Sequence, residues 1–242
     1  RGALSPQPPL RWGTLYPLPP FLRGALSPQS PLRRGARYTK MKPPLERGAR
    51  GDLNVDKYEK TQLIQTLIAH KEDVFSVIFS LDNQFIIAGS FDNTVSLWQY
   101  NSATGLFTNL PVVTISEPDS LWAIALNSNN NIIATANENG EVKFWTINGK
   151  LIKTITAHDD KIWGLNFSAD GKYLATASAD HTIKIWDSEG RFLKTVSGHK
   201  DEVLSVNFSP DSKYIVTGSE DRTVKLWDLT GKLLNTFTGH TN

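Results

Sequence analysis

The sequence contains no cysteine and only one methionine, Met41, in 242 residues. Without cysteine there can be no disulfide bond, cysteine-ligated zinc site or thiol nucleophile, and the composition fits a reducing compartment, so we expect a cytoplasmic protein. No apolar run approaches the roughly 18 residues that a membrane-spanning helix requires, and no apolar segment near the start resembles a secretory signal. We therefore expect no membrane partner.

Residues 1–60 differ in composition from the rest of the chain. Ten of the thirteen prolines fall between Pro6 and Pro44, and RGALSPQPPLR at Arg1–Arg11 recurs almost unchanged at Arg23–Arg33. This segment holds 12 Lys/Arg against 4 Asp/Glu, whereas residues 61–242 hold 14 against 20. Regular strands and helices do not accommodate so many prolines, so we predict a disordered, basic, proline-rich arm. Two alternatives stay open: an arm that binds an acidic partner, nucleic acid or an aromatic groove, and translated sequence upstream of a genuine start.

The remainder of the chain is built from repeats. The segment GHKDEVLSVNFSPDSKYIVTGSEDRTVKLWD at Gly198–Asp228 has near-copies at Ala157–Asp187, Ser116–Thr146 and Ala69–Gln99. Each copy contains three β-rich runs separated by turn residues, with no helical spacing. A fourth apolar run, such as Lys232–Phe237, follows each copy. The pattern predicts small antiparallel meanders of four strands.

The repeat period of 41 to 47 residues, with a Gly-His or Ala-His pair at one end and a Trp at the other, resembles the WD-repeat β-propeller family. The resemblance covers residues 61–242 and implies an all-β fold: an arc of four antiparallel four-stranded blades, then the start of a fifth. Near-identical tandem repeats suggest a bacterial-type multi-repeat WD protein. Gln62–Leu67 is predicted as a surplus leading strand, so the chain looks like a fragment of a larger ring. The longer join after Trp98 is expected to be a loop that turns at Thr104–Gly105.

Family resemblance also implies a buried hydrogen-bond relay in each blade, from a turn Asp through a loop His and a strand hydroxyl to a Trp. Blade one would use His70, Asp92 and Trp98 but has Ala88 at the hydroxyl position, and blade two keeps only Thr135 and Trp145. The relays expected in blades three and four are complete: His158, Thr176, Asp180 and Trp186, then His199, Thr217, Asp221 and Trp227. Such a network satisfies buried polar groups and makes a blade rigid.

Catalysis is not expected from these residues, although Ser, His and Asp together could suggest a hydrolase. Catalytic groups rarely come in one set per repeat. GARG at Gly48–Gly51 follows no strand and lacks the Lys-Ser/Thr of a nucleotide loop, and no His/Asp/Glu cluster outside the repeats has metal-ligand spacing. We therefore expect no enzyme activity, no cofactor, no metal and no small-molecule substrate.

The remaining candidate site is the face where the loops before the first strands and the turns after the second strands emerge. Family resemblance places three positions per blade there: Asp73, Phe75 and Phe91; Ser120, Trp122 and Glu138; Lys161, Trp163 and Ala179; Glu202, Leu204 and Glu220. Aromatic anchors surrounded by charge are typical of binding hot spots. The alternative for Trp122 and Trp163 is that they only fill space near a central channel.

We therefore expect a non-catalytic scaffold that binds a peptide or partner domain on this face. Because the face is acidic, a basic or neutral peptide is favoured over nucleic acid. Three alternatives remain: a structural fragment that self-associates to complete a ring, the remnant of a larger signalling protein or propeller enzyme, and a degraded gene product without a role.

Overall fold

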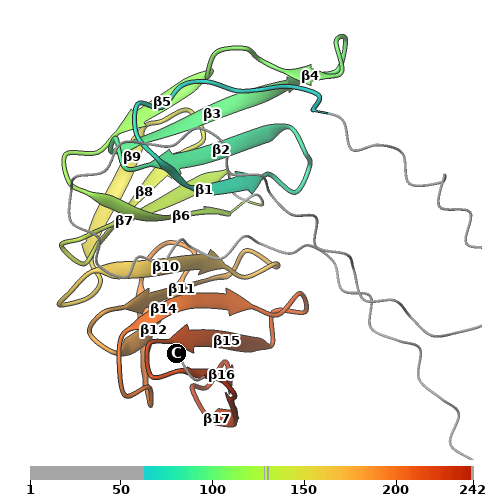
Figure 1. Cartoon of the computed structure of the whole chain (residues 1–242). Helices are drawn as coiled ribbons and strands as arrows, with labels where there is room; N and C mark the ends of the chain where they lie inside the picture. The colour runs from blue at the N-terminus through green and yellow to red at the C-terminus, as the bar shows by residue number, and fades with distance from the viewer. Residues whose placement is uncertain (1–62, 128, 130, 241–242) are drawn as a thin grey trace, which may run out of the picture. The chain divides into compact units, whose positions relative to one another are not determined.

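The computed structural model describes residues 63–127, 129 and 131–240. Within the described residues, seventeen strands form four antiparallel sheets in chain order, which confirms the all-β fold class. The predicted arm at residues 1–60 lies outside the described residues. Figure 1 shows the strands with their labels.

Each sheet is one blade, and its strands are arranged in sequence order. In blade one β5 pairs with β3, and the short strand β4 pairs with the end of β3. The strands of blade one are β1 (Val74–Phe79), β2 (Phe85–Ser90), β3 (Thr94–Asn101), β4 (Leu106–Phe107) and β5 (Val113–Ser116). Those of blade two are β6 (Leu121–Asn127), β7 (Ile132–Asn137), β8 (Glu141–Thr146) and β9 (Leu151–Thr156). Blade three contains β10 (Ile162–Phe167), β11 (Tyr173–Ser178), β12 (Thr182–Asp187) and β13 (Phe192–Ser197). Blade four contains β14 (Val203–Phe208), β15 (Tyr214–Ser219), β16 (Thr223–Asp228) and β17 (Leu233–Thr238).

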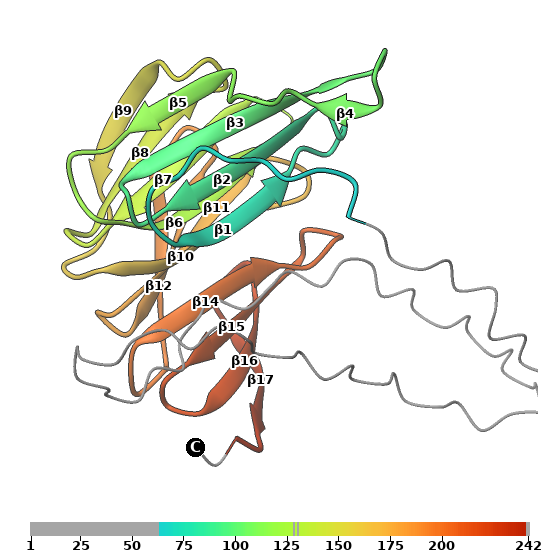
Figure 2. The ribbon, with the colours of Figure 1, turned by 45° about the horizontal axis from the view of Figure 1, so that its top comes forward.

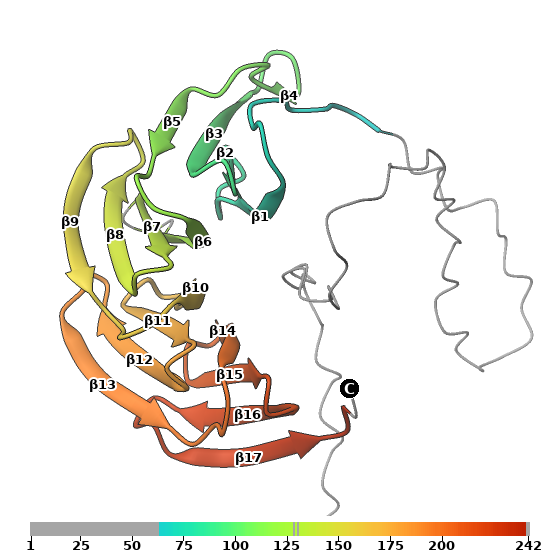
Figure 3. The ribbon, with the colours of Figure 1, turned by 60° about the vertical axis from the view of Figure 1, so that its left-hand side comes forward.

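The blades pack face to face. The first strands β6, β10 and β14 are neighbours (Figure 2). The outermost strands β5, β9, β13 and β17 lie along the outer edge (Figure 3). Middle strands such as β7 and β11 are buried on both faces, so they form continuous runs of small and branched residues rather than alternating patterns. Three apolar cores fill the three junctions, and typical members are Leu97 with Ile133, Phe144 with Leu174, and Ile185 with Ile215.

Two sequence predictions about strands need correction. Residues 63–69 form no strand, and Leu63 and Ile64 are 79% and 81% exposed. A strand is stabilised by backbone hydrogen bonds to a neighbour, and none of the described strands pairs with this segment. The long join of blade one is also more than a loop, because β3 continues to Asn101 and pairs with β4 in a hairpin. Gly105, with a φ of 71°, lies at its turn as expected.

The turn between the second and third strands has the same backbone in every blade. Asn93, Gly140, His181 and Arg222 occupy equivalent positions and have φ between 62° and 75°. At Gly140 an added Cβ would lie 2.1 Å from the carbonyl oxygen of His158, so only glycine fits there. His181 is exposed in this turn.

Candidate protein-interaction surface

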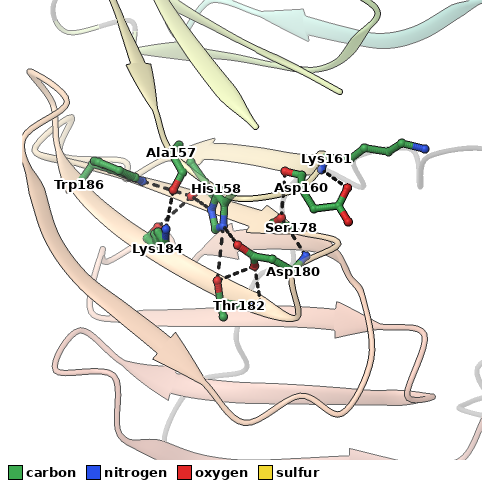
Figure 4. A network of polar contacts seen from close by, with 10 residues as sticks. Ala157, His158, Asp160, Lys161, Ser178, Asp180, Thr182, Lys184 and Trp186 are labelled. Carbon is green, nitrogen blue, oxygen red and sulfur yellow. Dashed lines mark hydrogen bonds and ion pairs between the residues drawn. The ribbon is translucent and has the colours of Figure 1, made fainter. Parts of the chain in front are cut away.

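Blade three contains a continuous chain of buried side-chain hydrogen bonds, shown in Figure 4. His158 Nδ1 lies 2.7 Å from Asp180, His158 Nε2 lies 2.6 Å from Thr176 Oγ1, and Trp186 Nε1 donates to the same Oγ1 over 3.2 Å. A carboxylate only accepts and an indole N–H only donates, so a neutral imidazole donates from Nδ1 to Asp180 and can accept at Nε2 from the threonine hydroxyl. Thr176 therefore connects the tryptophan to the histidine.

Blade four repeats this geometry. The His199–Asp221, His199–Thr217 and Trp227–Thr217 distances are 2.8, 2.7 and 2.9 Å. Burial lowers the pKa of His199, and the Asp221 carboxylate only partly opposes this. Burial raises the pKa of Asp221, but hydrogen bonds from Thr223, the Lys200 amide and His199 outweigh burial and hold that pKa well below its usual range.

Sequence analysis missed one threonine that both complete relays contain and one lysine beside them. The threonine two residues after the turn aspartate donates to it, with 2.6 Å between Thr182 and Asp180. Lys184 on the third strand donates through Nζ to the carbonyl oxygen of Ala157 over 2.6 Å (Figure 4). Both residue types recur at the repeat period. Thr223 donates to Asp221 over 2.6 Å, whereas Lys225 Nζ donates to Thr236 Oγ1 over 3.2 Å. That recurrence is the signal that could have identified them.

Blade two carries a different relay, which corrects the expectation that its relay is simply lost. Glu117 occupies the histidine position, and its carboxylate accepts from Thr135 over 2.5 Å and from Lys143 Nζ over 2.6 Å. Trp145 Nε1 still donates to Thr135 over 2.9 Å. The Glu117 side chain is only 2% exposed, so the lysine provides the charge partner that a buried carboxylate requires.

In blade one the relay is interrupted at Ala88. His70 Nδ1 lies 2.9 Å from Thr94 Oγ1 and 3.4 Å from Asp92. Burial raises the pKa of Asp92, but hydrogen bonds from Thr94, the Lys71 amide and His70 outweigh it and lower that pKa to about 2. His70 Nε2 and Trp98 Nε1 are buried and have no hydrogen-bond partner among the described residues.

The relay residues lie too deep to meet a substrate. His158 and Thr176 are 1% and 0% exposed, and Trp227 is 2% exposed. Within the described residues there is also no group of three or more His, Cys, Asp or Glu side chains that could hold a metal ion. No helix in that part of the chain is long and apolar enough to cross a membrane.

Four aromatic side chains on the candidate face touch one another in a single row across blades one to three, which we call the aromatic row: Phe75, Phe91, Trp122 and Trp163. Ring centroids are 5.3 Å apart for Phe75–Phe91, 5.2 Å for Phe91–Trp122 and 4.9 Å for Trp122–Trp163. The last two contacts are edge-to-face, a preferred aromatic geometry. Phe91 is 37% exposed and the others are half-buried, so the row combines a packed base with an accessible surface.

An irregularity of the first strand lies at the same position in every blade. The pairing register of the first strand shifts between Val74 and Ser76, between Leu121 and Ala123, and between Ile162 and Gly164. The shift in blade four lies between Val203 and Ser205. The residue inside each shift is Phe75, Trp122, Trp163 or Leu204. Such β-bulges redirect a side chain away from the regular pleat, which is how the fold presents these four residues.

Charged side chains flank the aromatic row. Lys161 Nζ lies 5.8 Å from the Trp122 ring centroid and 5.5 Å from that of Trp163, within cation–π range. Trp163 Nε1 donates to Glu202 over 2.7 Å, which links blades three and four. Burial, followed by the charges of Glu202 and Asp201, raises the pKa of Glu220.

The other predicted positions have mixed surroundings. Asp73 and Glu138 are exposed, and Ser120 and Leu204 are half-buried. Ala179 is only 8% exposed, so its side chain offers little surface to a partner.

Four-stranded meander sheets packed face to face, each with one buried tryptophan, define a β-propeller repeat protein. Residues 61–99, 109–146, 149–187 and 190–228 match the family model described as WD domain, G-beta repeat. These matches cover more than half of the sequence, and the chain belongs to the WD40 repeat family.

Curated relatives match parts of the chain. Periodic tryptophan protein 2 homolog of Schizosaccharomyces pombe is 28% identical over 36% of this chain and 10% of its own length. Probable cytosolic iron-sulfur protein assembly protein 1 of Kluyveromyces lactis is 31% identical over 35% of this chain and 27% of its own length. Nuclear distribution protein nudF of Aspergillus terreus is 28% identical over 40% of this chain and 25% of its own length. These relatives are eukaryotic, so they do not support the expected bacterial type.

Solved structures share the fold. U3-55K and the WD40 repeats of RRP9 each match at a TM-score of 0.64 and 21% identity over 73% of this chain. The match spans 55% and 54% of those chains, so this chain corresponds to about half of each.

Proposed function

We propose that this chain is a non-catalytic interaction module that binds a peptide or partner domain through its aromatic row. WD40 repeat proteins are generally protein-interaction scaffolds. The observation that carries the proposal is the contact chain Phe75–Phe91–Trp122–Trp163, which runs across three blades. A row fixed by β-bulges and edge-to-face contacts loses little conformational freedom on binding, so more of its contact energy contributes to affinity.

The charges around the row favour a basic or neutral peptide. Asp73, Glu138 and Glu220 are exposed, and Glu202 lies at the end of the row. Their field would attract Lys or Arg side chains and repel the phosphates of nucleic acid. Lys161 already lies over both tryptophan rings, so a basic side chain of the partner would displace it and keep the cation–π contact.

Selection from a random peptide library displayed on phage, followed by calorimetry with the full chain, tests this proposal. Enriched peptides should be basic or aromatic. Phe91→Ala or Trp163→Ala should weaken the affinity of the chain for these peptides by at least about thirtyfold, as expected at a hot spot. Tyr214→Ala is the matched control. Tyr214 is an exposed aromatic at the start of β15, whereas the candidate-face residue Glu220 follows the end of that strand. Circular dichroism and thermal unfolding establish that each variant is folded.

Either of two results would overturn the proposal. Equal weakening by Tyr214→Ala would place binding elsewhere. Unfolding of both Phe91→Ala and Trp163→Ala would mean that the row only fills space between blades.

A second candidate is association through the free faces of blades one and four. Val216 and Phe237 are 37% and 49% exposed, whereas their repeat equivalents Ala175 and Val196 are buried against blade four. Val74 of blade one is 47% exposed, although its equivalent Val203 is fully buried. The exposed face of blade four and the exposed face of blade one therefore correspond to the two surfaces that pack together where neighbouring blades meet.

Light scattering of the full chain after size exclusion tests this candidate. It predicts a defined dimer that Val216→Lys converts to a monomer, with peptide binding at the aromatic row retained. A monodisperse monomer at high concentration would exclude it.

We further propose a cytoplasmic location, supported by the absence of cysteine and tested by imaging a tagged chain. Exclusive recovery from a secreted fraction would contradict it.

A further inference from the structure

Three polar atoms of blade one are buried without a partner. They are His70 Nε2, Trp98 Nε1 and Ser96 Oγ, none of which has a hydrogen-bond partner among the described residues. The side chain of His70 is 5% exposed, and Trp98 and Ser96 are 2% and 1% exposed. Buried polar groups in folded proteins are nearly always satisfied, so this cluster requires an explanation.

The repeats indicate what is missing from this place. Ala88 occupies the position of Thr176 and Thr217, whose hydroxyl oxygens connect His to Trp in blades three and four. Ser96, the cross-strand partner of Ala88, occupies the position of Lys184 and Lys225. Blade one therefore lacks a hydroxyl, a methyl and most of a lysine side chain where the other blades are filled.

The two rings have not moved together to close the gap. The centroids of His70 and Trp98 are 6.0 Å apart, and those of His199 and Trp227, which bridge through a hydroxyl, are 6.1 Å apart. The space between the rings therefore matches a single oxygen atom with two hydrogen-bonding neighbours. A buried water occupies such a site when it has two to four polar partners and room for about one probe sphere.

We propose that this gap is a binding site for one ordered water molecule that replaces the missing threonine hydroxyl. Trp98 Nε1–H can only donate, so the water accepts from it. His70 Nδ1 faces Asp92 and Thr94, which leaves Nε2 as an acceptor for one hydrogen of the water. The second hydrogen is directed to Ser96 Oγ. Blade one then has a complete relay in which solvent supplies one member.

Nuclear magnetic resonance of the full chain tests the site directly. The indole proton of Trp98, assigned with Trp98→Phe, should show a cross-relaxation peak to water whose sign identifies a bound molecule rather than exchange. The indole protons of Trp186 and Trp227 should show none, because threonine hydroxyls occupy their sites. Thr176→Ala in blade three should create a new water peak at Trp186.

Two substitutions of equal volume separate a wet site from a dry one. Ala88→Thr should remove the water peak and lower the unfolding equilibrium constant about fivefold, because a fixed hydroxyl replaces the water. Ala88→Val fills the same space without a hydroxyl. At a wet site it expels the water, so its unfolding constant should exceed that of the wild type by at least about twofold, whereas filling a dry gap would lower that constant. The proposal is overturned if wild-type Trp98 shows no water peak, or if Ala88→Val is more stable than the wild type.

Discussion

The threonine that joins histidine to tryptophan is the most informative residue to change, and Thr176→Val is the sharpest change. Valine has the shape of threonine, so no cavity forms. Trp186 Nε1 and His158 Nε2 lose their shared partner at distances of 3.2 and 2.6 Å, in a site where Thr176 is 0% exposed. Each unsatisfied buried group costs about 1–3 kcal/mol, so with two such groups we expect a loss of about 2–6 kcal/mol in the free energy of unfolding.

Thr176→Ser is the matched control, because it keeps the hydroxyl and removes one methyl group, which costs about 1 kcal/mol. Urea unfolding of the full chain, followed by tryptophan fluorescence and circular dichroism, measures the total effect. Repeat proteins can unfold in parts, so amide hydrogen exchange in β11 and β12 localises it. If the valine variant were as stable as the serine variant, the relay would contribute nothing and our account of the buried network would be wrong.

Two further predictions concern backbone and pH. Gly140→Ala should lower the free energy of unfolding by more than about 2 kcal/mol, because Gly140 has a positive φ and an added Cβ would clash with His158. Gly239→Ala is the control for thermal unfolding and should change it little, because nothing lies within 4 Å of the added Cβ. Acid should destabilise the fold in two steps, because the lowered pKa values of His199 and Asp92 mean that the unfolded chain binds protons first. Melting temperatures should fall as the pH drops below about 6.5, and fall further between pH values of about 4 and 2; a melting temperature that rose on acidification would contradict both assignments.

The blade architecture could be predicted from sequence because the local signals agree with one another. β-rich runs, turn residues and a buried tryptophan recur at nearly constant spacing, so each repeat predicts the same meander. The turn position occupied by Gly140, His181 and Arg222 could not be predicted in the same way. All three residues have a left-handed backbone, yet only the glycine indicates that conformation from sequence.

The rest of the candidate site depends on geometry that residue types do not encode. The aromatic row results from a one-residue shift in strand pairing, and nothing in the local sequence of Phe75 or Trp122 signals a bulge. The hairpin after Asn101 depends on pairing between Tyr100 and Phe107, which a purely local reading treats as a loop. The missing hydroxyl at Ala88 is visible in the sequence, but the sequence does not show that the His70 and Trp98 rings keep the spacing of His199 and Trp227.

Blade two shows why comparison by residue identity underestimates a degenerate repeat. Glu117 is chemically unlike histidine, yet it accepts from Thr135 while Lys143 neutralises its charge. Glu117→Gln should therefore cost about 3–5 kcal/mol, because the Lys143 ammonium, 12% exposed, loses its counter-charge. Glu117→Gln combined with Lys143→Met should recover much of that loss, since the methionine fills the space and leaves no unpaired charge. Urea unfolding of the two single variants and the double variant measures this coupling, and strictly additive effects would mean that the ion pair does not maintain the blade-two relay.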